Sequence, residues 1–206
     1  MEVGAGTCWA IQQFAERGCK CVALDFLKHN KLEMADYWFE EKNLYFERIL
    51  ADMDKSGFRE SSFDIVYGLA SFMYSKNITD TLHEMNRILK FGGKIILISE
   101  PVIGLCRSVT HRKHGSGWAY SIFEWDRYIR DAGFRVTKRF FADSIKMRFK
   151  NPEMITRKNR WYYHAVKLLN PLWETKFLKS ITPDNFSWLY SVFMPLPLMI
   201  VAVKEK

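Results

Sequence analysis

The sequence is poor in the residues that define disulfide-rich, fibrous and zinc-binding proteins. Its 206 residues include 4 cysteines, 11 glycines and 6 prolines. Four cysteines are too few for a disulfide scaffold, and no CxxC pair or Cys/His cluster indicates a zinc site. The apolar fraction of 48% is large enough to offset chain entropy, which excludes a disordered chain. The composition therefore predicts one globular domain, with room for an elaboration.

The sequence also lacks a long apolar segment and a secretory leader. Its most apolar stretch, residues 192–203, is interrupted by Pro195 and Pro197, whereas a bilayer span takes roughly 20 apolar residues. Residues 1–6 have no basic region followed by an apolar one. We therefore expect a cytoplasmic protein with no transmembrane segment, for which peripheral contact with a membrane stays open.

Charge is divided unevenly along the chain. Residues 1–100 carry 12 basic and 15 acidic residues, whereas residues 101–206 carry 19 basic and 8 acidic ones. The basic half also holds five of the seven tryptophans. This half favours an anionic substrate, a membrane surface or a nucleic acid, and a solvated basic surface is an equally good interpretation.

Strand-like and helix-like segments alternate through the first half. Helical spacing occurs at 7–17, 30–42 and 79–90, and strand-like runs occur at 2–3, 20–24, 46–51, 63–67 and 94–99. Such alternation predicts a parallel sheet with helices on both faces. A capping box at Ser121 and Glu124 then predicts a helix ending at Gly133, followed by strands at 134–141 and 198–203.

Two segments do not fit this alternation. Residues 102–120 are rich in His, Arg, Lys and Gly and are predicted to form a loop. Residues 142–197 are too long for a structureless connection, so we expect helices there, for example at 158–169. We interpret 142–197 as an inserted lid or substrate-recognition segment, and 1–141 with 198–206 as the core.

Acidic and glycine residues follow the predicted strands. Asp25, Asp52 and Glu100 each follow a strand, and Gly4 and Gly6 follow the first one. Ligands of parallel sheets bind at the carboxyl ends of strands, and glycines allow a ligand to approach the backbone. A carboxylate 19 residues after the second glycine is placed to accept from two ribose hydroxyls. The pattern predicts a cofactor that contains a nucleoside.

The same segment disfavours a phosphate-bearing cofactor. Trp9 occupies the third glycine position of the dinucleotide fingerprint, and the Walker pattern is absent. The start of the first helix has no Lys or Arg for a phosphate. A nucleoside cofactor without phosphates, S-adenosylmethionine, fits this turn better.

Five ordered motifs carry a family resemblance. They are Glu2-Val-Gly-Ala-Gly-Thr-Cys8, Ala23-Leu24-Asp25, Leu50-Ala51-Asp52-Met53, the strand at 62–66 and the segment from Leu82 to Gly93. Together they resemble class I S-adenosylmethionine-dependent methyltransferases of the broad small-molecule branch, through about residue 141 and again at 198–204. The resemblance implies a Rossmann-like, mostly parallel seven-stranded α/β sheet whose last strand is antiparallel.

Three positions depart from the family pattern. Cys8 replaces a glycine, Phe91 replaces a proline, and the first strand is short because the chain begins at Met1. From the short strand we expect a chain truncated at its amino terminus.

The resemblance and the strand ends together give candidate site residues. For the cofactor they are Glu2, Gly4, Gly6, Asp25, Phe26, Asp52 and Met53. For the acceptor they are Tyr74, Glu100, Trp118, Arg148 and Trp161, with structural hydrogen bonding as an equal alternative for Glu100. His111 and His114 are the candidate general bases, because they follow the fifth strand on the expected acceptor side.

The preferred hypothesis is methyl transfer from S-adenosylmethionine to a small or mid-sized acceptor, including an anionic, sugar-linked or lipid-linked one. An RNA methyltransferase that uses the basic half is the first alternative. A cofactor-binding protein without catalysis is the second, and a nicotinamide oxidoreductase is a distant third.

Overall fold

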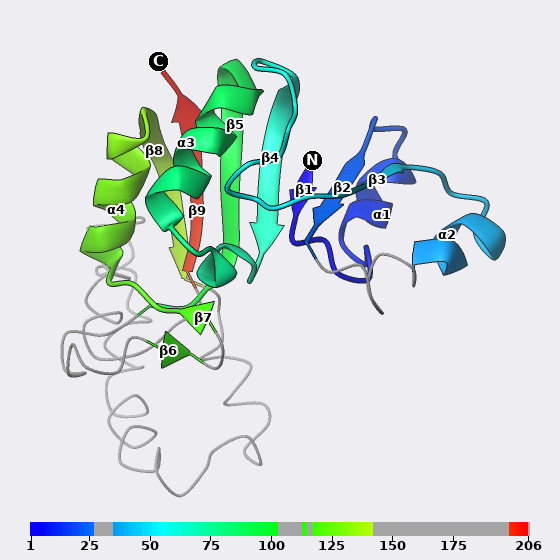
Figure 1. Ribbon diagram of the computed structural model, residues 1–206, viewed down its shortest axis with the longest axis horizontal. Coiled ribbons are helices and arrows are strands. Elements are labelled where there is room, and N and C mark those ends of the chain that lie inside the picture. The colour runs from blue at the N-terminus through cyan, green and yellow to red at the C-terminus, as the bar shows by residue number, and fades with distance from the viewer. Residues whose placement is uncertain (27–34, 103–112, 115–116, 142–197, 206) are drawn as a thin grey trace, which may run out of the picture.

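The structure is a computed structural model that describes residues 1–26, 35–102, 113–114, 117–141 and 198–205. Seven of its strands form one sheet in the order β3-β2-β1-β4-β5-β9-β8 (Figure 1). Their bounds are β1 Glu2–Val3, β2 Val22–Asp25, β3 Glu47–Leu50, β4 Phe63–Leu69, β5 Leu89–Glu100, β8 Phe134–Phe141 and β9 Leu198–Lys204. Strands β1 to β5 are parallel, whereas β9 is antiparallel to β5 and β8. The predicted sheet, with its antiparallel last strand, is confirmed.

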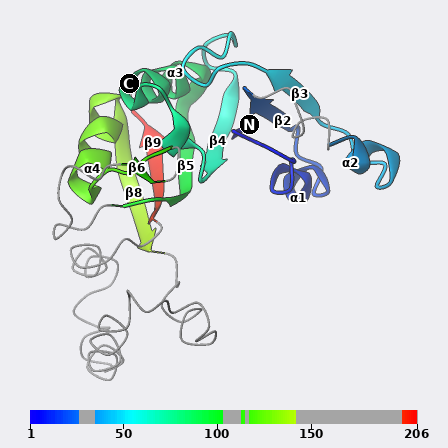
Figure 2. The same cartoon turned by 60° about the horizontal axis from the view of Figure 1, so that its bottom comes forward.

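Helices cover both faces of the sheet. They are α1 Ile11–Ala15, α2 Asp36–Glu40, α3 Ile78–Ile88 and α4 Ile122–Asp131, with a 3-10 helix, η3, at Phe72–Tyr74. Figure 2 shows α3 and α4 over the β5–β8 half of the sheet, and α1 and α2 at its β1–β3 end. None of the helices in the described part is long and apolar enough to span a membrane.

The two faces bury cores of different size. Leu24 belongs to a cluster of 21 buried residues that joins α3 and α4 to the sheet, whereas neighbouring Ala23 belongs to a cluster of six around α1. Successive residues of a strand point to opposite faces, so the two clusters lie on opposite sides. Trp125 of α4 and Met85 of α3 are fully buried in the larger one.

Helix α4 begins where its capping box predicts. The Ser121 hydroxyl oxygen accepts from the Glu124 backbone N–H at 3.2 Å, and the Glu124 carboxylate accepts from the Ser121 backbone N–H at 2.9 Å. Both bonds satisfy N–H groups that the first turn of a helix leaves without partners.

The short first strand lies in the centre of the sheet. Glu2 pairs with Ala23 of β2 on one side and with Tyr67 of β4 on the other. The Met1 amino group donates to the Ile65 carbonyl oxygen at 2.8 Å. The strand order therefore reverses between β1 and β4, which is the place where open α/β sheets bind ligands.

Three predicted boundaries were wrong. Helix α1 begins at Ile11 rather than at residue 7, because Cys8 has a φ of 60° and belongs to the preceding turn. Helix α3 ends at Ile88, not at the glycine pair, because Leu89 already pairs with Phe63 as the first residue of β5. Residues 113–118, predicted as part of a loop, contain two paired strands, β6 Lys113–His114 and β7 Gly117–Trp118.

The predicted helix at 158–169 and the insert at 142–197 lie outside the described residues. Residues 30–34 of the helix predicted at 30–42 also lie outside them, and α2 forms only residues 36–40 of that range.

Candidate functional site

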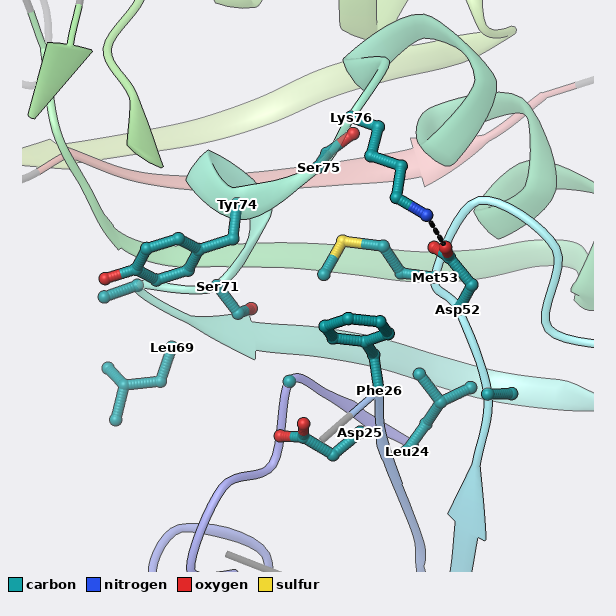
Figure 3. Close-up of a pocket in the computed structure, with 13 residues that line it drawn as sticks. Leu24, Asp25, Phe26, Asp52, Met53, Leu69, Ser71, Tyr74, Ser75 and Lys76 are labelled. Atoms are coloured by element: carbon teal, nitrogen blue, oxygen red, sulfur yellow. Dashed lines mark hydrogen bonds and ion pairs between the residues drawn. The ribbon is translucent and has the colours of Figure 1, made fainter. Parts of the chain in front are cut away.

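A cavity of about 580 Å³ opens at the carboxyl ends of β1, β2 and β4 (Figure 3). This volume lies within the usual range for small-molecule sites. Its walls come from the turn after β1, from the end of β2 and from the segments that follow β3 and β4. The lining residues are Gly4, Leu24, Asp25, Phe26, Ala51, Asp52, Met53, Leu69, Ala70, Ser71, Tyr74, Ser75 and Lys76.

The turn after β1 forms the floor of the cavity. Gly4 has a φ of +64°, and a Cβ added there would lie 2.5 Å from the Ser71 Cβ. No other residue type fits this contact between two chain segments. The Gly6 backbone N–H donates to Asp25 Oδ2 at 2.8 Å, so the turn is tied to the end of β2.

Cys8 occupies the position where the family pattern has a glycine. Its φ of 60° is left-handed, and its side chain is fully buried. Burial raises the pKa of the Cys8 thiol to about 12, which excludes a reactive thiolate at neutral pH. The cysteine thus keeps the backbone shape of the glycine it replaces.

Asp25 and Phe26 end β2 at the mouth of the cavity. Asp25 is largely buried, whereas the Phe26 ring is 61% exposed. The Lys76 ammonium lies 5.7 Å from the centre of the Phe26 ring. An exposed aromatic ring beside a carboxylate offers an apolar surface and a hydrogen-bond acceptor to the same ligand.

Asp52 lies on the opposite wall and is paired with a lysine. Its Oδ2 is 2.6 Å from the Lys76 ammonium, and its Oδ1 accepts from the Asp54 backbone N–H at 3.1 Å. The hydrogen bond from Lys76 lowers the pKa of the Asp52 carboxyl. Met53 follows Asp52 and lies between it and Phe26 in Figure 3.

Hydrogen bonds fix the segment that carries Asp52 to helix α3. Asp54 Oδ1 accepts from the Thr81 hydroxyl and, at 3.3 Å, from the Ser75 hydroxyl. Glu84 accepts from the Ser56 backbone N–H at 2.9 Å. These bonds hold both ends of the segment against a rigid element, which pre-organises the wall.

Glu2 and Gly6 lie behind the cavity rather than in its lining. The Glu2 carboxylate is 2% exposed and accepts from the Tyr67 hydroxyl at 3.2 Å. Burial raises the pKa of the Glu2 carboxyl to about 7, against the opposing effect of Tyr67 and the Ile11 backbone N–H. Contact of these two residues with a cofactor stays a prediction.

Glu100 is 1% exposed and does not line the cavity. Its carboxylate accepts from the backbone N–H groups of Ser71, Phe72 and Met73, so it has the structural role that we considered beside acceptor contact. We therefore do not carry Glu100 forward as an acceptor contact.

The expected acceptor side is described in part. Tyr74 lines the cavity and is 54% exposed, and Trp118 of β7 is 40% exposed. A Cβ added at Gly117 would lie 2.6 Å from the end of the Met73 side chain, so β7 packs directly on η3. His114 is the second residue of β6. His111, Arg148 and Trp161 lie outside the described residues.

Sequence reasoning missed four lining residues at and after the end of β4, namely Leu69, Ala70, Ser71 and Lys76. The position of this segment at the carboxyl end of a strand beside the switch point was the available signal.

The lining residues fit a cationic nucleoside cofactor better than a diphosphate. Lys76 is the one basic residue among the lining residues of the described chain, and it is already paired with Asp52. Two carboxylates, Asp25 and Asp52, face the same space from different walls. Carboxylates accept from ribose hydroxyls and an adenine amino group, and they favour a sulfonium charge.

Comparison with known proteins finds similarity to methyltransferases. The family model described as a methyltransferase domain matches residues 1–97. A sterol 4-C-methyltransferase of Caenorhabditis elegans is 27% identical over 99 residues, which are 47% of this chain and 29% of that protein. The chain therefore spans less than a third of the length of that relative.

Two solved structures share the fold. The S-adenosyl-L-methionine complex of phosphoethanolamine N-methyltransferase 2 from Haemonchus contortus has a TM-score of 0.68 at 19% identity, covering 100% of this chain and 48% of that one. Geranyl diphosphate C-methyltransferase from Streptomyces coelicolor has a TM-score of 0.67 at 13% identity, covering 100% and 70%. Over residues 1–97 the chain is therefore similar to the methyltransferase domain family, and its sheet shares the fold of these methyltransferase structures.

Proposed function

We propose that the protein transfers the methyl group of S-adenosylmethionine to a small or mid-sized, lipid-linked acceptor. The observation that carries the transfer is the cavity at the switch point, with Asp25 and Asp52 on two of its walls. The lipid class is supported by exposed aromatic surface at Tyr74 and Trp118. The names of two similar proteins, which refer to a sterol and to geranyl diphosphate, support the same class.

Each cofactor residue has a separate task in this proposal. Asp25 accepts from the ribose hydroxyls, and Asp52 accepts from the adenine amino group. Phe26 and Met53 supply apolar surface beside the base. Gly4 keeps the floor of the cavity free of side-chain atoms, so that the cofactor lies close to the backbone.

The protein's part in catalysis is alignment. S-adenosylmethionine, when bound, supplies a methyl group that its sulfonium has already activated. Holding the acceptor in line and excluding water therefore lower most of the barrier. Tyr74 and Trp118 form the proposed acceptor wall. A base is needed only where the acceptor atom loses a proton, and His114 is our proposal for that case.

Labelled cofactor tests this function directly. The protein is incubated with S-adenosylmethionine that carries a labelled methyl group and with lipid, polar-metabolite and RNA fractions of a cell extract. We expect label in the lipid fraction with the wild type and with E60Q, a control at an exposed residue away from the cavity, and loss of label with D25N. Glu60 and Asp25 are both acidic, so the comparison separates position from charge.

The other outcomes distinguish the alternatives. Label in the RNA fraction contradicts the lipid acceptor and supports the nucleic-acid alternative. Binding of S-adenosylmethionine by calorimetry without label in any fraction supports a protein that binds the cofactor and does not catalyse. Absence of both binding and label overturns the proposal.

A further inference from the structure

The loop between β4 and α3 is held by one buried carboxylate from a different strand. Glu100 Oε1 accepts from the backbone N–H groups of Ser71 and Phe72, both at 3.0 Å, and Oε2 accepts from that of Met73 at 2.9 Å. Three successive N–H groups that converge on one anion form a nest, which favours negative charge. The anion here is a side chain of the protein itself.

The backbone on both sides of this contact is held in an unfavourable conformation. Ala70, directly before the three donors, has a φ of 49°, and Ser99, directly before Glu100, has a φ of 59°. Left-handed φ is unfavourable for a non-glycine residue, and it persists where surrounding contacts impose it. The bonds to Glu100 are such contacts, because they fix the loop immediately after Ala70.

The loop that Glu100 binds at residues 71–73 joins the cofactor side of the site to the acceptor side. Residues 69–71 and 74–76 line the cavity, and Glu100 binds Ser71 and the two residues that follow it. Ser71 packs on Gly4 of the turn after β1, and Met73 packs on Gly117 of β7. A shift of residues 71–73 therefore moves the cavity wall, its contact with the floor and its contact with β7 together.

We propose that Glu100 is a positioning residue that sets the alignment of cofactor and acceptor by holding residues 71–73. The inference rests on the proposed function, because it gives the hydrogen bonds of Glu100 a role in methyl transfer. Glu100 touches neither reactant: it acts through Ser71, which forms the cavity wall, and through Met73, which supports β7.

Glutamine at this position separates positioning from mere filling of space. The E100Q side chain has the same length, but its amide has one acceptor oxygen where the carboxylate has two. That oxygen can still accept from the backbone N–H groups of Ser71 and Phe72. The amide NH₂ then faces the Met73 N–H, so that two donors oppose each other. The variant thus breaks the contact nearest to the acceptor side and removes the charge from the nest.

The experiment compares the wild type, E100Q and the matched control E60Q at pH 8. At this pH the carboxyl is ionised, although burial raises its pKa to about 7. We expect E100Q to weaken binding of S-adenosylhomocysteine about tenfold by calorimetry, the effect of losing a hydrogen bond to a charged group. We also expect kcat to fall by a larger factor than KM rises, because alignment is lost. For E60Q we expect affinity, kcat and KM within twofold of the wild-type values.

Amide hydrogen exchange supplies a readout that needs neither turnover nor ligand. In the wild type we expect slow exchange at Ser71, Phe72 and Met73, and in E100Q faster exchange confined to residues 69–77, with the rest of the sheet unchanged. Equal exchange and equal affinity in E100Q and the wild type overturn the inference. So does fast exchange of these amides in the wild type, a result that decides the matter even where E100Q does not fold.

The two proposals fail in different ways. A wild type that binds S-adenosylhomocysteine but labels no acceptor contradicts the proposed function. In that case the effects of E100Q on affinity and on amide exchange still test whether Glu100 positions residues 71–73. A wild type that transfers methyl groups with unchanged kcat in E100Q contradicts the inference alone.

Discussion

The floor and one wall of the cavity meet at a single contact and are held in contrasting ways. The floor is the turn after β1, where two left-handed residues are glycines and Asp25 binds the Gly6 N–H. The wall is the loop after β4, where left-handed Ala70 is not a glycine and Glu100 binds three N–H groups from 27 to 29 residues away. The floor combines its own glycines with one bond to Asp25, 19 residues away, whereas the wall has a non-glycine residue in a left-handed conformation and three bonds to Glu100.

Replacing Gly4 should disturb both the floor and the wall of the cavity, and it should give the largest loss of ligand affinity. In G4A the new Cβ collides with Ser71, at 2.5 Å, on a backbone with a φ of +64°. We expect a loss of S-adenosylhomocysteine affinity of more than a hundredfold and a lower melting temperature. The control is G57A, at a glycine that is also left-handed, with a φ of +77°, but that has nothing within 4 Å of the added Cβ. Comparable losses in both variants would show that strain alone, not the contact, matters.

The D25N variant should disturb the floor of the cavity and leave the wall in place. D25N removes the charge that accepts from Gly6 and, in the proposed function, from the ribose. Two hydrogen bonds to a charged group correspond to an affinity loss on the order of a hundredfold. Calorimetry measures the affinity, and amide exchange should stay slow at residues 71–73. An unchanged affinity contradicts the ribose role of Asp25.

The two buried glutamates should make stability depend on pH. Burial raises the pKa of both Glu2 and Glu100 from 4.5 to about 7. The folded state thus binds these protons more tightly than the unfolded state does, so the free energy of unfolding falls as pH rises from about 4.5 to about 7, by up to about 3 kcal/mol for each group. Urea unfolding across this range measures the slope, and E2Q and E100Q should each flatten it. A slope that neither variant changes contradicts the assignment.

Removing Lys76 should give the smallest effect. Its ion pair with Asp52 is exposed on the lysine side, and exposed pairs contribute about 1 kcal/mol or less. We expect K76M to change S-adenosylhomocysteine affinity by less than about threefold. The pKa of Asp52 should rise toward its ordinary value, which titration by NMR follows. A tenfold loss of affinity would instead make Lys76 a binding residue of the cavity.

The sequence predicts the sheet and the floor of the cavity because their signals are local. Gly4, Gly6 and the strand-end carboxylate Asp25 are separated by a short, regular spacing, and the apolar runs mark the strands directly. The antiparallel last strand follows from the family resemblance, and the antiparallel pairing of β9 with β5 and β8 confirms it.

The role of Glu100 is not local, and the sequence leaves it undecided. Its three donors lie 27 to 29 residues upstream, so only the register of β4 against β5 brings them together. The end of α3 has the same cause: Leu89 leaves the helix because Phe63 pairs with it across the sheet. Pairing between distant segments outweighs local propensity at both places.

The unequal cores leave the face of the sheet that carries α1 with fewer buried side chains than the face that carries α3 and α4. Among the described residues, 21 buried side chains hold α3 and α4 to the sheet, and six hold α1 and its surroundings. We therefore expect local unfolding to begin on the α1 side of the β1–β3 end, which carries the cavity floor and Asp25. A ligand that bridges this end to the loop after β4 adds its binding free energy where the protein has least of its own. Cofactor occupancy then governs how long the β1–β3 end survives heat or a protease.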